Sequence, residues 1–173
     1  MQRLQELAQG GLYEPSTEHA NCGVGFMASL SGVKSHDIVE KALEILCGLE
    51  HRGACGCDPR TGDGAGILIQ LPHKFLQEAT SGLGFRLPDE REYGTGLVFL
   101  PPDAGQRARC EEMFEAMVVA EGQAVLGWRD VPRNSEVLGI VARSVEPTIR
   151  QIFIARGKSI KDDAAFERKL YII

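Results

Sequence analysis

The sequence predicts a mixed α/β domain. Short runs of alternating apolar residues, typical of strands, are separated by segments in which apolar residues recur at helical spacing. Of the 173 residues, 43% are hydrophobic and 25% are charged, which is an ordinary globular composition. This length is enough for one domain with a core of its own. Periodicity alone does not supply the order of the layers.

The first strand is expected to begin at Cys22, in the run CGVGFMASL. Its alternating apolar side chains are Val24, Phe26, Ala28 and Leu30. Gly23 and Gly25 weaken a strand unless another group comes close to the backbone. Because glycine leaves space beside the chain, we expect room for a substrate at this end of the strand.

A helix is expected next, capped by Ser35 and running to about Leu49. Asp37 lies in its first turn, where a negative charge is favourable. The stripe that should be buried consists of Ile38, Ala42, Ile45 and Leu49. A long glycine-rich loop, HRGACGCDPRTGDGAGILIQLP, then leads into a strand in which Ile67 and Ile69 alternate with other residues.

The second half of the chain continues with a short helix at 74–79 and an apolar strand, GLVFLP, from Gly96. Asp103 and Gln106 form a capping-box pattern that opens the next helix. The stripe of that helix consists of Cys110, Met113, Phe114, Met117 and Val118, and it predicts core packing. AVLGW and IRQIFIAR are expected to be strands, and Asp162 is expected to start the last helix.

Charge and hydropathy argue against two classes of partner. The net charge is -5 and the sequence has no basic run, so a nucleic-acid backbone would be repelled. No run of 18 apolar residues is present, so we expect no membrane span. The first residues have no apolar stretch of signal-peptide length. We therefore expect a cytoplasmic protein.

The cysteines favour neither a disulfide framework nor a metal site. They are Cys22, Cys47, Cys55, Cys57 and Cys110. An odd number without a secretion signal argues against disulfides. Cys55 and Cys57 are separated by a single residue, which is closer than a zinc knuckle uses, and no second Cys/His pair follows at zinc-finger spacing. We expect no metal here and assign both residues to loop packing.

Thiol chemistry needs a thiolate and a group that takes its proton. His19, His36, His51 and His73 are isolated in the sequence, and surface or capping roles are favoured for all of them. A second solution uses no histidine. If the chain were cut after Asn21, Cys22 would carry a free α-amine with a reference pKa of about 7.7–8.0. One residue would then supply both nucleophile and base.

Several segments carry a resemblance to a known family. EHANCGVGFMASL is followed by SHDIVEKALEILCGLEHRG and ACGCDPRTGDGAGILIQLPHKF, and later by EVLGIVARSVEPTIRQIFIARG and FERKLYII. These segments resemble the glutaminase domain of the class II glutamine amidotransferases. The long loop GACGCDPRTGDGAGI and the later segments resemble the glutamate synthase branch. The resemblance covers the chain from about Leu12 onward.

This resemblance implies the α+β fold class, as an N-terminal-nucleophile (Ntn) hydrolase αββα sandwich that is incomplete here. It also implies hydrolysis of L-glutamine to L-glutamate and ammonia through a glutamyl thioester on Cys22. Residues 1–21 would be a propeptide, because an acylated Cys22 nitrogen cannot act as a base. Residues 22–173 would be the first part of the amidotransferase domain.

Arg52, in the HRG motif, is the second site residue that the resemblance suggests. Its guanidinium would anchor the N-terminal strand or favour the thiolate; a salt bridge that braces the loop is an equal alternative. Gly53 and the run Gly62–Gly66 would shape the loop beside the site. Asp63 would pair with Arg52 or cap the turn.

The family places its oxyanion-hole Asn-Gly pair and its glutamine α-carboxylate groups further along the domain than Ile173. We therefore expect this chain alone to be nearly inactive. No cofactor is expected in this segment. FMN, a 3Fe-4S cluster and the synthase domains that aminate 2-oxoglutarate are expected in the parent enzyme. The alternatives are a non-catalytic remnant or regulatory module of the same fold, and another class II amidotransferase.

Overall fold

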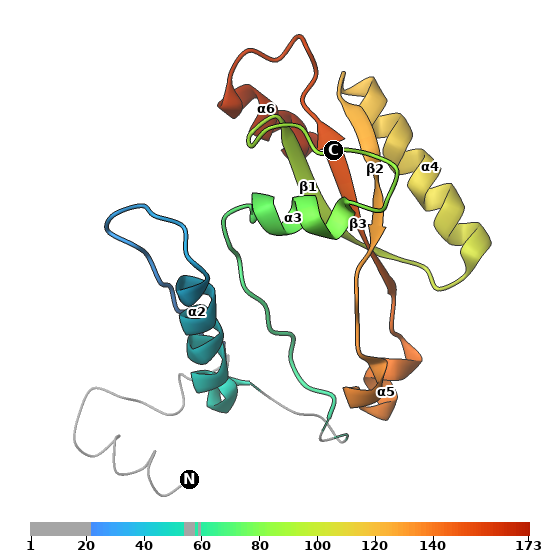
Figure 1. Ribbon diagram of the computed structural model, residues 1–173. Helices are drawn as coiled ribbons and strands as arrows, with labels where there is room; N and C mark the ends of the chain where they lie inside the picture. The colour runs from blue at the N-terminus through green and yellow to red at the C-terminus, as the bar shows by residue number, and fades with distance from the viewer. Residues whose placement is uncertain (1–21, 54–57, 59) are drawn as a thin grey trace, which may run out of the picture. The chain divides into compact units, whose positions relative to one another are not determined.

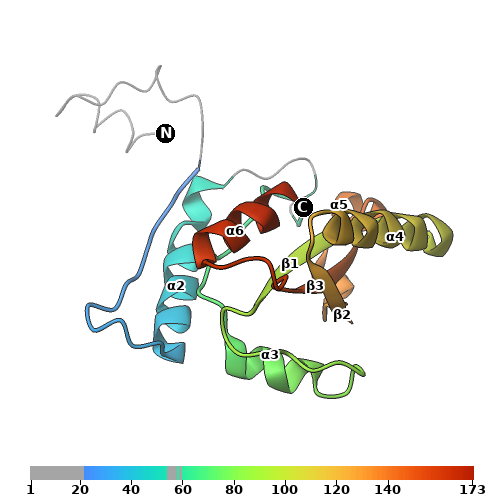
Figure 2. The same ribbon diagram turned by 90° about the horizontal axis from the view of Figure 1, so that it is seen from above.

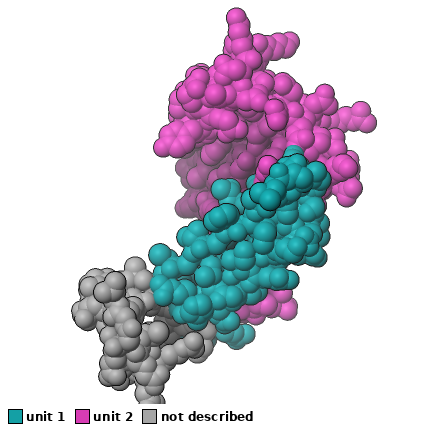
Figure 3. Space-filling view, turned by 90° about the vertical axis from the view of Figure 1, so that its left-hand side faces the viewer, with its two compact units in different colours: residues 1–69, 139–141 teal, residues 70–138, 142–173 magenta. Residues whose placement is uncertain are grey.

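The chain divides into two compact units in the computed structural model, which describes residues 22–53, 58 and 60–173 (Figure 1). Unit 1 comprises Met1–Ile69 and Gly139–Val141, and unit 2 comprises Gln70–Leu138 and Ala142–Ile173 (Figure 3). The propeptide expected at residues 1–21 lies outside the described residues, as do Cys55 and Cys57. The domain boundary after Asn21 therefore stays a prediction.

Unit 1 contains the helix that the sequence predicted, α2 (His36–Gly48), followed by the 3-10 turn η2 (Glu50–Arg52). Ser35 occupies the N-cap position, although its side chain makes no capping hydrogen bond. Asp37 lies in the first turn and accepts a hydrogen bond of 2.7 Å from Lys41 Nζ. This bond and the negative charge of Asp37 raise the pKa of Lys41.

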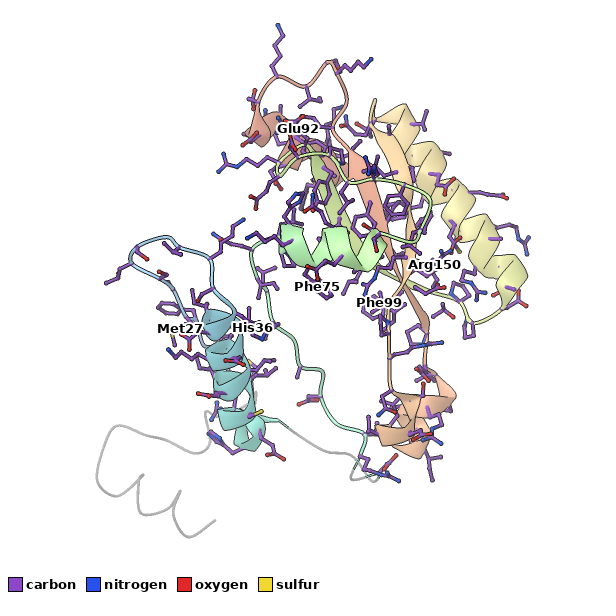
Figure 4. The ribbon with its side chains drawn as sticks, in the orientation of Figure 1. Met27, His36, Phe75, Glu92, Phe99 and Arg150 are labelled. Carbon is purple, nitrogen blue, oxygen red and sulfur yellow. The ribbon has the colours of Figure 1, made fainter. Side chains whose placement is uncertain are left out.

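The residues from Cys22 to Ser29 do not form the expected half-buried strand. They run beside α2 without strand pairing, and Met27 is labelled on this segment in Figure 4. The side chains of Val24 and Phe26 are 93% and 89% exposed. The prediction was wrong because no other strand among the described residues pairs with this segment, so the alternating side chains have nothing to pack against.

The glycines of this segment are in tight contact with α2. An ideal Cβ at Gly23 would lie 2.7 Å from Leu49 Cδ2, and one at Gly25 would lie 2.3 Å from Ile45 Cγ2. Both distances are shorter than any real carbon–carbon contact between non-bonded groups. Leu49 and Ile45 therefore fill the space that the sequence assigned to a substrate, and that expectation was wrong. The apolar stripe of α2 is half-covered rather than buried.

Unit 2 is built on a three-stranded antiparallel sheet with the order β1-β3-β2. Its strands are β1 (Tyr93–Leu100), β2 (Ala124–Asp130) and β3 (Thr148–Ala155). The three strands confirm the predictions for this half, with β1 starting before Gly96. No strand forms at Ile67–Ile69, where Leu68 is fully exposed, so the strand expected there was wrong.

Helices cover both faces of this sheet (Figure 2). Helix α3 (His73–Thr80) lies on one face, where its Leu76 packs with Tyr93 and Phe153. Helices α4 (Ala104–Ala120) and α6 (Asp163–Ile172) lie on the other face. The core on that side is formed by Val118, Ile152 and Ile154, with Val98, Phe114, Val125, Trp128, Leu170 and Ile173 packed against it.

A bulge in β2 keeps its large side chains on the α4 side. The register with β3 shifts between Val125 and Gly127, so that Val125 pairs with Ile154 and Trp128 pairs with Ile152. The extra residue, Leu126, packs in the opposite layer. An ideal Cβ at Gly127 would lie 2.5 Å from Phe85 Cδ1, which explains why glycine occupies that position.

The helix ends of unit 2 follow the predicted capping. Asp103 Oδ1 accepts a hydrogen bond from the Gln106 amide at 2.8 Å, and Asp162 Oδ1 accepts one from the Ala165 amide at 2.7 Å. The stripe predicted for α4 is only partly core. Val118 is fully buried, whereas Met113 is 74% exposed, because only part of that stripe reaches the sheet.

Three short helical elements among the described residues were not predicted. They are η2 in unit 1, the turn η3 (Ser135–Val137) and the helix α5 (Ile140–Ser144). The last two precede β3. They contain too few residues to show a helical period in the sequence.

Replacing Gly94 by alanine should destabilise unit 2. The new Cβ would lie 2.4 Å from Leu170 Cδ1, so the Leu170 side chain or α6 would have to shift, at a cost of about 1–3 kcal/mol. Gly96→Ala is the matched control on the same strand, since nothing lies within 4 Å of its Cβ position. Urea unfolding followed by the fluorescence of Trp128, the only tryptophan, measures both variants. Equal losses in the two variants would contradict the packing of α6 on β1.

Gly25→Ala should weaken unit 1 in a way that Ile45→Ala repairs. The first substitution places a Cβ 2.3 Å from Ile45 Cγ2, and the second removes that carbon. We expect a coupling free energy of about 0.5–3 kcal/mol in a double-mutant cycle, measured by urea unfolding with far-ultraviolet circular dichroism. Gly48→Ala, which meets nothing within 4 Å, should be additive with Ile45→Ala. Additivity in both pairs would refute the contact.

Candidate active site

Cys22 and Arg52 lie at the same end of α2. Cys22 is exposed. Its neighbour Gly23 packs against the side chain of Leu49, the C-cap residue of α2. The Arg52 amide donates a hydrogen bond of 2.8 Å to the carbonyl of the same Leu49. Leu49 therefore connects the two residues: its side chain holds the N-terminal segment, and its carbonyl holds the turn that carries the arginine.

Gly53 closes the turn that carries Arg52. Its amide donates to the Glu50 carbonyl at 3.1 Å, and its backbone is extended. A Cβ at this position would meet only the Glu50 carbonyl oxygen, at an ordinary distance of 3.4 Å. The structure thus places Gly53 where η2 ends and the glycine-rich loop begins.

The described histidines have partners close to them. His36 Nε2 lies 3.8 Å from Glu40 Oε1 on the same helix. His51 Nδ1 donates to the Gly48 carbonyl at 2.9 Å. In unit 2, His73 Nδ1 lies 3.0 Å from the Tyr93 hydroxyl, and burial together with Glu90 raises the pKa of Tyr93. The contacts of His36 and His51 match the surface and capping roles expected from the sequence. His73 is half-buried against Tyr93, so for that residue the expectation was wrong. His19 lies outside the described residues.

Metal ligands do not cluster in the part of the chain that the structure describes, where no three His, Cys, Asp or Glu side chains come together around a common point. In the same part, no helix combines the length and the apolar character needed to cross a membrane.

Asp58 is a polar centre that sequence reasoning did not single out. Its Oδ2 accepts hydrogen bonds from Thr61 Oγ1 at 2.8 Å and from the Val141 amide at 3.3 Å. Its Oδ1 accepts one from the Arg60 amide at 3.1 Å. The bond from Thr61, followed by that from Arg60, lowers the pKa of Asp58. Asp followed by Pro was a turn signal, but nothing in the sequence linked it to residues 139–141.

Comparison with known proteins identifies a family. The family model for class-II glutamine amidotransferases matches residues 22–173. The chain is 45% identical over 163 residues to the glutamate synthase [NADPH] large chain of Bacillus subtilis. The aligned region covers 94% of this chain and 11% of the relative. It is 40% identical over 167 residues to the glutamate synthase [NADH] of Schizosaccharomyces pombe, with 94% of this chain and 8% of the relative covered.

A third relative extends the comparison to another electron donor. The ferredoxin-dependent glutamate synthase 2 of Synechocystis is 41% identical over 155 residues, which cover 90% of this chain and 10% of the relative. The chain thus spans about a tenth of the length of these relatives. Since the family model matches most of its residues, the chain belongs to the class II glutamine amidotransferases.

Proposed function

We propose that, within a polypeptide of the relatives' length, this chain carries out the glutaminase half-reaction of a glutamate synthase, with Cys22 as the nucleophile. The observation that carries the proposal is the position of Cys22: it is exposed, it is the first residue matched by the family model, and it lies at the same end of α2 as Arg52. The relatives that share 40–45% of its residues are all named as glutamate synthases, which favours that branch over other amidotransferases.

In the proposed reaction, the Cys22 amine takes the proton of its own thiol. The thiolate attacks the side-chain carbonyl carbon of L-glutamine and forms a tetrahedral oxyanion. The carbon–nitrogen bond then breaks, the ammonium group returns its proton to the leaving nitrogen, and ammonia departs. Water next attacks the resulting thioester, its proton passes to the amine, and cleavage of the carbon–sulfur bond releases L-glutamate and the thiol.

The amine can act as a base only when it is free. While Asn21 is joined to Cys22, that nitrogen belongs to an amide and does not accept a proton. We therefore propose that residues 1–21 are removed before the enzyme works. The start of the family match at residue 22 supports this boundary.

Arg52 has an electrostatic role in the proposal. Cys22 and Arg52 lie at the same end of α2. The guanidinium of Arg52, in the turn that follows α2, would bring a positive charge to the end where the thiolate attacks. Arg52 also has interactions of its own. A bracing role for the loop is the alternative.

The remaining parts of the activity belong to a protein of the relatives' length. We propose that a complete αββα sandwich supplies the oxyanion hole and the groups that bind the glutamine α-carboxylate. Further domains with FMN and a 3Fe-4S cluster would use the ammonia to aminate 2-oxoglutarate. The described residues offer no set of ligands for such a cluster. No electron donor is assigned, because relatives named for NADPH, NADH and ferredoxin match to a similar degree.

A second candidate function is a non-catalytic module of the same fold. The exposed apolar side chains of unit 1 favour it for the chain in isolation, since Val24, Phe26 and Leu68 are between 89% and 101% exposed and have no partner surface among the described residues. Covalent labelling of Cys22 separates the two candidates.

Diazo-oxo-norleucine, a glutamine-like electrophile, should label Cys22 in a polypeptide of the relatives' length that contains these 173 residues. Intact mass should show that the labelled species begins at Cys22. Cys22→Ser should lower glutamine-dependent turnover by roughly 1,000-fold or more, because removal of a nucleophile removes the covalent path. Cys47→Ser, at another exposed thiol, is the control and should retain activity. Turnover retained in Cys22→Ser, or an active species that still begins at Met1, would overturn the proposal.

Arg52→Lys should reduce glutaminase activity while leaving the fold intact. Lysine keeps the positive charge but loses the planar fork of the guanidinium, so we expect a fall of about tenfold in kcat/KM. Steady-state ammonia release measures the effect, and circular dichroism checks α2. Lys41→Arg, a charge-preserving exchange on the same unit, is the control. Unchanged kinetics in Arg52→Lys would leave Arg52 with a structural role alone.

A further inference from the structure

Two side chains of α2 support the segment that carries Cys22. An ideal Cβ at Gly23 would lie 2.7 Å from Leu49 Cδ2, and one at Gly25 would lie 2.3 Å from Ile45 Cγ2. Two residues of an extended chain span about 6.6 Å, and four residues of a helix span about 6 Å. Because these spacings agree, both contacts form at once, and the segment runs antiparallel to the helix.

The two supporting side chains are fixed in different ways. Ile45 is β-branched, with Cγ2 attached directly to Cβ, so it has one strongly preferred χ1 rotamer in a helix. Leu49 has a flexible side chain on a fixed backbone. Its amide donates to the Ile45 and Leu46 carbonyls, both at 3.1 Å, and its carbonyl accepts the Arg52 amide at 2.8 Å. A Cβ at Gly25 would therefore displace the segment rather than Ile45.

The supports matter for the nucleophile because the proposed processing makes Cys22 the first residue of the chain. The first residues of a chain are poorly ordered unless a folded element holds them. The side chains of Val24 and Phe26 are 93% and 89% exposed, so they do not anchor this segment among the described residues. Its backbone at Gly23 and Gly25 is in contact with α2 instead. The position of the Cys22 thiol and amine is therefore set through these two glycines.

We propose that Leu49 and Ile45 are positioning residues for the glutaminase reaction. They hold the backbone that carries the Cys22 thiol and amine, and neither takes part in bond making or breaking. The positioning role rests on the proposed function, whereas the contacts of the two glycines with α2 do not.

Kinetics in a polypeptide of the relatives' length test this role. A displacement of about 1 Å in a reacting group can cost about 100-fold in rate. We therefore expect Leu49→Ala and Gly25→Ala to lower kcat by about 10- to 100-fold, with a smaller change in KM. Labelling of Cys22 by diazo-oxo-norleucine should slow by the same factor as kcat. Leu49→Met, which keeps a long apolar side chain, should restore most of the activity.

Alkylation of Cys22 by iodoacetamide, followed by the mass of the peptide that contains it, is the second readout. This reagent needs no glutamine site, so its rate should stay at the wild-type value in Leu49→Ala and Gly25→Ala. An equal fall in alkylation and in kcat would overturn the positioning role, because the reactivity of the thiol itself would then have changed.

A double variant tests the contact at Gly25 without altering Leu49. Ile45→Ala removes the carbon that a Cβ at residue 25 would meet, so Gly25→Ala with Ile45→Ala should be more active than Gly25→Ala alone. The matched controls on α2 are Gly48→Ala, whose Cβ meets nothing within 4 Å, and Leu43→Ala, which truncates a leucine that is 45% exposed. Both should keep wild-type kinetics.

The outcomes separate the positioning role from the proposed function. Wild-type kcat and labelling in Leu49→Ala and Gly25→Ala, with α2 intact by circular dichroism, would overturn the role and leave the proposed function standing. If Leu49→Ala loses helicity, the Gly25 pair decides: a double variant no more active than Gly25→Ala would overturn the role. A wild-type protein that diazo-oxo-norleucine does not label would overturn the proposed function and the role together.

Discussion

The close approach of two glycines to α2 determines where the candidate nucleophile lies. Gly23 and Gly25 have no Cβ, so Leu49 and Ile45 can rest against the backbone of the N-terminal segment. This contact half-covers the apolar stripe of the helix and brings Cys22 to the end at which Arg52 follows. The glycines thus serve the packing of the segment, and they are not open space for a substrate. A side chain at either glycine would collide with Leu49 or Ile45.

Unit 2 has a core of a different kind, built around its central strand. Because β3 pairs on both sides, its alternating residues enter two layers: Phe153 packs under α3, and Ile152 and Ile154 pack under α4 and α6. The buried polar side chains of Thr80, Gln123 and Gln151 have local hydrogen-bond partners. Gln151 Oε1, for example, accepts a hydrogen bond from Arg129 Nη1 at 2.9 Å. Arg150, labelled in Figure 4, joins Glu111 of α4 to Asp130 of β2. Unit 2 is therefore a self-contained scaffold, whereas the candidate site residues belong to unit 1.

The two units also differ in how well sequence patterns describe them. The strands of unit 2 form where the sequence predicted them, because each has a pairing partner and packed helices within the described residues. The helix α4 follows its predicted stripe only in part, since Met113 is exposed. In unit 1 the same kind of alternation, from Val24 to Leu30, stands beside a helix without a partner strand, so its side chains stay exposed. A period describes which side chains can be buried together. It does not say whether a surface is present to bury them.

The sequence by itself determined the family and identified Cys22 as the candidate nucleophile. It also predicted the helices whose N-caps are Ser35, Asp103 and Asp162. Motifs and caps are local, so they depend only on neighbours in the chain. Only the tertiary structure decided that Leu49 links Cys22 to Arg52, and that Asp58 reaches Gly139 and Val141. These contacts join residues far apart in the chain through a missing Cβ or a single carboxylate. Such contacts produce no periodic pattern in the sequence. Only the tertiary structure therefore shows which of these residues are in contact.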